Sequence, residues 1–185
     1  MEIRLSIGLL GLLLLLASAL SAKAPKAVID PVDPDTVALA ALEDQLALER
    51  NNLELARRLT STYLKMGRPG IAIAAVRTMP PEVARDPVLT HRLAQAYEAS
   101  GRVDDALATA HLARARCMAQ NKLSSGEGSC SASTMAVLDM HADALSMLKR
   151  WGVQDPKHDS RAALAYRLAQ RTASIASLGL RVPMQ

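Results

Sequence analysis

The sequence predicts an all-α protein of about seven helices, stacked as helical hairpins with a degenerate hairpin at the C-terminal end. The first observation is that the chain matches itself at a 34-residue offset. The second is that alanine and leucine supply the apolar mass, while aromatic residues make up 2% of the chain and phenylalanine is absent. Small and unbranched apolar side chains suit closely packed helices better than sheets. The residues that recur are Leu59, Tyr63, Gly67, Arg68, Ala72 and Ala74, which return as Leu93, Tyr97, Gly101, Arg102, Ala106 and Ala108, with Leu55/Leu89 and Arg58/Arg92 extending the match.

This period and this order of residues resemble the tetratricopeptide repeat (TPR) family over roughly residues 53–113. The resemblance implies a TPR-like solenoid whose repeats span about 53–86 and 87–120. Each repeat then has a first helix bearing Leu and Tyr, a turn at Gly67 or Gly101, and a second helix bearing Ala. The first copy departs from the family pattern at Thr60, where the family prefers Gly or Ala.

The N-terminus is typical of an export signal. Arg4 precedes an unbroken run of apolar residues and glycine from 7 to 16, and small residues follow. We therefore assign 1–22 as a signal peptide, cleaved after Ala22 or after Ala19. A membrane anchor is the alternative, but the run is short for a span of about 20 residues. Residues 23–35 contain three prolines and are expected to form an extended linker.

The helical repeats are expected over 36–120. A capping helix over 36–50 has apolar residues at helical spacing, and Asp35 or Thr36 is suited to begin it. The two repeats then place helices at 52–66, 69–78, 86–100 and 103–120, and Pro80-Pro81 breaks the chain between them.

After the second repeat the 34-residue phase is lost, because the position where a third repeat needs its turn glycine is Met135. Residues 121–132 are rich in Ser and Gly and predict a flexible loop, closed by a disulfide between Cys117 and Cys130. A pair of free thiols is the alternative. Residues 133–185 predict a C-terminal hairpin and tail, with helices at 133–150 and from Asp159 or Ser160 onward.

The resemblance also implies the partner-binding face, because the outward face of each first helix lines the groove in TPR proteins. The residues at these positions are Arg57, Ser61, Leu64, Lys65, Val88, His91, Gln95 and Glu98. We expect Arg57 to be the strongest single contact with a protein or peptide partner.

No motif in the chain indicates catalysis, a cofactor or a metal, so we expect a non-catalytic binding scaffold, periplasmic or secreted. Four scattered histidines lack zincin spacing, and the glycines of 126–128 lack a phosphate-binding lysine. A zinc site formed by the two cysteines with His111 and His141 is the less favoured alternative to the disulfide. The net charge of +4 and the scarcity of aromatic residues disfavour nucleic-acid binding, and no membrane span remains after cleavage. A self-associating structural subunit and an enzyme with an unrecognised site remain the alternatives.

Overall fold

The computed structural model describes residues 34–123 and 130–177. The chain divides into two compact units, Met1–Thr36 and Val37–Gln185, and the description below concerns the second. The predicted signal peptide and the linker up to residue 33 lie outside the described residues, as do the middle of the cysteine loop and the C-terminal tail.

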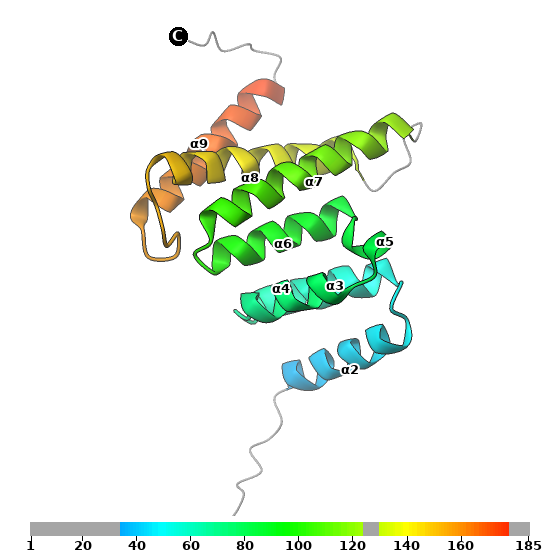
Figure 1. Ribbon diagram of the computed structural model, residues 1–185. Helices are drawn as coiled ribbons and strands as arrows, with labels where there is room; N and C mark the ends of the chain where they lie inside the picture. The colour runs from blue at the N-terminus through cyan, green and yellow to red at the C-terminus, as the bar shows by residue number, and fades with distance from the viewer. Residues whose placement is uncertain (1–33, 124–129, 178–185) are drawn as a thin grey trace, which may run out of the picture. The chain divides into compact units, whose positions relative to one another are not determined.

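The described residues form eight helices and no strand, which confirms the all-α prediction (Figure 1). The helices are α2 (Pro34–Leu48), α3 (Leu53–Lys65), α4 (Pro69–Thr78), α5 (Pro81–Ala84), α6 (Pro87–Ala99), α7 (Val103–Leu123), α8 (Ala132–Arg150) and α9 (Ser160–Ser177). Each predicted helix begins within about two residues of its expected start. The prediction of about seven helices missed α5, because Pro80-Pro81 was taken only as a break. Pro81 instead occupies the first turn of a short helix, where its missing N–H is not needed.

The first helices of the two repeats begin with the same local structure. The side chain of Asn52 caps α3 by accepting a hydrogen bond from the backbone N–H of Leu55 at 3.1 Å. The Asp86 carboxylate caps α6 in the same way, accepting from the N–H of Leu89 at 2.8 Å. The two caps are related by the 34-residue offset, so the repeat period fixes helix starts as well as helix faces.

Three hairpin turns share one glycine-dependent geometry. Gly67, Gly101 and Gly152 have φ of +67°, +73° and +68°, a left-handed conformation that side chains disfavour. In the second turn the N–H of Gly101 donates to the carbonyl of Glu98 at 2.9 Å, and the next N–H donates to the carbonyl of Tyr97 at 2.9 Å. The same pair of bonds closes the other two turns. This Schellman arrangement satisfies carbonyls that the end of each helix leaves open.

The 34-residue register extends back into α2. The hydroxyl of Tyr63 donates to the Glu43 carboxylate of α2 at 2.6 Å. One period later, the guanidinium of Arg77 in α4 donates to the hydroxyl of Tyr97 at 2.8 Å. Glu43 and Arg77 are themselves related by the 34-residue offset. Thus α2 packs on α3 through the same pair of positions by which α4 packs on α6, so α2 occupies the position of a second helix of a hairpin.

The C-terminal hairpin, α8 and α9, turns at Gly152, where the sequence predicts the end of the helix over 133–150. Gly152 lies 51 residues after Gly101, because α7 extends to Leu123 and the cysteine loop adds further residues. In Figure 1, α6, α7 and α8 form successive layers and α9 crosses α8. The spacing of buried residues in α7, at Val103, Ala106 and Ala110, recurs in α9 at Ala162, Ala165 and Ala169. Small side chains let these second helices approach their partners closely.

Candidate partner-binding face

The predicted partner-binding residues lie on α3 and α6, two helices that pack against each other. Lys65 is exposed, and Ser61, Val88 and Gln95 are partly exposed. Leu64 is also partly exposed, but it packs against the main core. The remaining three predicted residues, Arg57, His91 and Glu98, are held by contacts within the chain.

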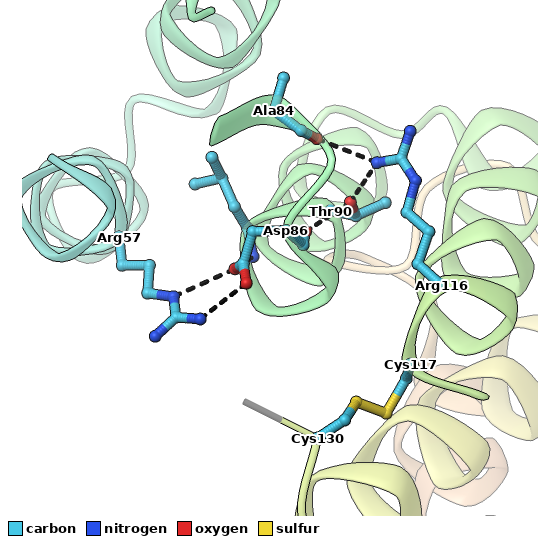
Figure 2. A network of polar contacts seen from close by, with 8 residues as sticks. Arg57, Ala84, Asp86, Thr90, Arg116, Cys117 and Cys130 are labelled. Carbon is cyan, nitrogen blue, oxygen red and sulfur yellow. Dashed lines mark hydrogen bonds and ion pairs between the residues drawn. A yellow bond between two sulfur atoms is a disulfide. The ribbon is translucent and has the colours of Figure 1, made fainter. Parts of the chain in front are cut away.

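Arg57, the expected strongest contact with a partner, forms an ion pair within the chain. Its Nε and Nη2 atoms donate to the two carboxylate oxygens of Asp86 at 3.0 and 2.7 Å (Figure 2). The Asp86 side chain is only 3% exposed, and the Arg57 side chain 24%. A bidentate pair with a buried carboxylate uses the donors that a partner would need, so Arg57 joins α3 to the start of α6.

A second arginine ties α7 to the same region. Nη1 of Arg116 donates to the carbonyl of Ala84 at 2.9 Å and to the hydroxyl of Thr90 at 2.6 Å. That hydroxyl in turn donates to the backbone carbonyl of Asp86 at 2.7 Å. Figure 2 shows this arginine beside Cys117, so the end of α7 is fixed both by Arg116 and by the bond to Cys130. These hydrogen bonds hold α7 against the start of α6.

His91 and Glu98 belong to a buried polar cluster with His141 of α8 and Tyr166 of α9, here called the His–Glu–Tyr cluster. The carboxylate of Glu98 accepts from the Tyr166 hydroxyl at 2.6 Å and lies 3.1 Å from Nε2 of His141. The rings of His91 and His141 meet edge to face, 4.8 Å apart. His91 is only 7% exposed, so little of its side chain is accessible to a partner in this conformation. The C-terminal hairpin covers this end of the α6 face.

The cluster shifts the acid–base behaviour of two of its members. Burial, with smaller contributions from the positive charges that His141 and Arg92 can carry, lowers the pKa of His91 to about 3. Burial, followed by the Glu98 charge and hydrogen bond, raises the pKa of Tyr166 above its ordinary value. Near neutral pH, His91 is therefore a neutral ring and Tyr166 a neutral donor.

This burial predicts a specific acid sensitivity. The folded pKa of His91 lies below the unfolded value of about 6.5, so the unfolded chain binds more protons as pH falls. Above a pH of about 6.5, the titration of His91 does not reduce the free energy of unfolding. Below that pH the free energy of unfolding falls progressively toward pH 3, with a loss of about 2 kcal/mol at pH 5. We expect His91→Leu to remove this part of the loss, so that the variant loses less unfolding free energy than the wild type between pH 7.5 and pH 5. Urea unfolding of both proteins at the two pH values measures the difference.

Nε2 of His91 has no hydrogen-bond partner among the described residues, so leucine removes no bond made by that atom. Acid-sensitive interactions elsewhere in the chain are present in both proteins, and their effect cancels in the difference. An identical drop in stability between the two pH values for variant and wild type would contradict the prediction.

The residues that remain exposed on α3 and α6 form two matched rows, here called the α3–α6 stripe. The rows contain Glu54, Arg58, Ser61 and Lys65 on α3, and Val88, Arg92, Gln95 and Ala99 on α6. Within each row the spacing of four, three and four residues keeps all four side chains on one helix face. Each residue of the first row has its 34-residue equivalent in the second.

Arg58 and Arg92 are the functional candidates that the sequence reasoning missed. Arg58 is exposed, and Arg92 is partly exposed with its Nη1 donating to the Gln95 side chain at 2.9 Å. Their identity at the 34-residue offset was visible in the sequence and was the signal that could have found them. The family pattern instead pointed to the positions of Arg57 and His91, which turn toward the interior here.

Other features of the described residues lie apart from the stripe. A cavity of about 390 Å³ opens between α7, α8 and α9, lined by residues that include His111, Arg114 and Asp139. Within residues 34–123 and 130–177, no group of three or more His, Cys, Asp or Glu side chains is arranged to hold a metal ion. None of the helices in this part of the chain is long and apolar enough to cross a membrane.

Cys117 and Cys130 are placed at disulfide distance and joined, with Cα atoms 5.4 Å apart. Both cysteines are buried, and they form a small core with Ala113, Leu138 and Met135. The bond connects α7 to the residue just before α8 and so attaches the C-terminal hairpin to the second repeat. Such a bond fits an oxidising compartment.

Comparison with known proteins adds no relative. Neither the known protein families, nor the curated proteins, nor the solved structures contain a match to this chain.

Proposed function

We propose that this chain is a non-catalytic, TPR-like scaffold that binds a protein or peptide partner in an exported compartment. The observation that carries the proposal is the α3–α6 stripe, in which two packed helices present side chains at equivalent positions of the repeat, with arginine at both 58 and 92. A face repeated along a solenoid is suited to an elongated partner. The disulfide and the export signal expected at residues 1–22 support the compartment.

Site-specific photo-crosslinking tests the proposal. A benzophenone amino acid replaces Ser61 or Gln95, which are partly exposed equivalents on the two rows. Irradiation of cells that naturally produce the chain is expected to attach a partner at both positions. Because each probe sits on the stripe without joining the buried networks, the fold is retained.

Ala74 and Ala108 supply the matched control. They are exposed, they are related by the same 34-residue offset, and they lie on the second helices α4 and α7. Crosslinks to the same partner from these positions, and none from Ser61 or Gln95, would move the interface to the second helices. The absence of a crosslinked protein from all four positions would refute the scaffold proposal.

A self-associating structural subunit is the second candidate, because helices near the ends of the described chain expose apolar side chains. Leu48 and Val37 of α2 are 86% and 56% exposed, and Leu164 of α9 is 43% exposed. Stacking of copies through these helices would bury such side chains. Sedimentation velocity over a range of protein concentrations separates this candidate from a scaffold that remains monomeric until it binds a partner.

A further inference from the structure

The charges on the α3–α6 stripe identify the chemistry of the partner. The stripe has three cations, Arg58, Lys65 and Arg92, and one carboxylate, Glu54. Arg58 and Lys65 form no ion pair with any other described residue, and the side chain of Arg92 donates to the neutral amide of Gln95. The surface is therefore positive.

Besides Glu54, two carboxylates lie at the start of α6 and on α6, and both are engaged inside the protein. Asp86 holds Arg57 with both oxygens, and it also caps α6. Glu98 is held by Tyr166 and lies beside His141. These groups stay with their internal partners, because each is buried or nearly so and separating a buried pair leaves an uncompensated charge. The positive charge of the stripe is thus left for an external group.

The spacing of the cations favours an elongated ligand. Arg58 and Lys65 are seven residues apart on one helix, which is about 10 Å along the axis. Arg92 lies on the packed neighbouring helix, whose axis is about 8–10 Å away. An extended segment advances about 10 Å in three residues, so an acidic side chain at every third position matches this separation.

We infer that the partner presents a segment of acidic side chains to the α3–α6 stripe, where Arg58 and Arg92 make equivalent contacts with its carboxylates. This inference rests on the proposed scaffold function and specifies its ligand. The two arginines provide planar, bidentate donors, and Lys65 adds a third cation at the end of α3. Val88 and Ala99 supply apolar contacts at the two ends of the α6 row. The stripe contains no aromatic side chain on which nucleic-acid bases could stack, which favours an acidic protein segment over a nucleic acid.

The test uses the full chain and fluorescein-labelled probes of about 12 residues. The acidic probe repeats Glu-Ala-Leu, the basic probe repeats Lys-Ala-Leu, and single-stranded DNA of similar length is the third. We expect fluorescence anisotropy to show binding of the acidic probe only, weakened at least about tenfold by Arg58→Glu with Arg92→Glu. The same double variant is expected to bind the basic probe, and added salt is expected to weaken both complexes.

A charge-matched variant separates a specific face from general attraction. Arg50→Glu with Arg171→Glu makes the same change in net charge at exposed positions outside the stripe, and we expect it to bind the acidic probe within about twofold of wild type. Equal losses in the two double variants, or no binding of the acidic probe, would overturn the inference. DNA binding that depends on Arg58 and Arg92 would overturn the inference and indicate that the partner is a nucleic acid. If Ser61 crosslinks a partner whose binding is unaffected by the arginine substitutions, the scaffold function stands and the acidic specificity fails.

Discussion

Replacing Asp86 with alanine is expected to lower the free energy of unfolding by about 3 kcal/mol, because one substitution removes two interactions. The carboxylate caps α6 through the N–H of Leu89, and it neutralises Arg57 through two hydrogen bonds. Loss of a helix cap costs about 1 kcal/mol. The larger share comes from Arg57, whose side chain, 24% exposed, is left without its counter-charge. Urea denaturation followed by circular dichroism measures the change.

The repeat provides its own control for this prediction. Asn52 occupies the equivalent cap position of α3, and its carbonyl oxygen accepts from the N–H of Leu55. Since Asn52 has no buried cation to neutralise, Asn52→Ala should cost only about 1 kcal/mol. In the Asp86→Ala background, Arg57→Met should recover part of the loss by removing the stranded charge. Equal losses for Asn52→Ala and Asp86→Ala would show that the ion pair contributes no stability.

The sequence predicted the helices well because local chemistry determines them. Gly67 and Gly101 end first helices, and Asp86 and Pro69 lie at helix starts, each for reasons contained within a few neighbouring residues. Gly152 was recognised as the end of a helix for the same reasons. Its equivalence to the other turn glycines was missed because the longer α7 and the cysteine loop shift the period.

The candidate site was predicted less well, because it depends on contacts between distant segments. Nothing local to His91 reveals that α8 brings His141 against it, or that Tyr166 of α9 reaches Glu98. The repeat phase pointed to α3 and α6 as the partner-binding helices, and tertiary packing decides which of their side chains are accessible. That packing pairs Arg57 with Asp86 and buries His91, while Arg58 is exposed and Arg92 partly exposed.

Reduction of the bond between Cys117 and Cys130 is expected to lower the free energy of unfolding by about 3 kcal/mol, since a closed loop of this length restricts the unfolded chain. Thermal unfolding with and without dithiothreitol measures the change as a fall in melting temperature. Reduction is a better test than substitution, because buried thiols still fill the core formed with Ala113 and Leu138. Thiol labelling of the denatured, unreduced protein should find no free sulfhydryl.

The position of the bond also predicts where the reduced protein loosens. Cys117 follows Arg116, which ties α7 to Ala84 and Thr90, so the α7 end of the released loop retains a second attachment (Figure 2). The start of α8, where Ser131 caps the helix through exposed groups, has weaker anchoring. Hydrogen exchange should therefore accelerate more in the first turns of α8 than around residue 116 of α7. Arg116→Met should remove this difference, because both ends of the loop would then depend on the disulfide. Uniform acceleration along α7 and α8 in the reduced wild type would mean that the arginine does not hold α7 in place.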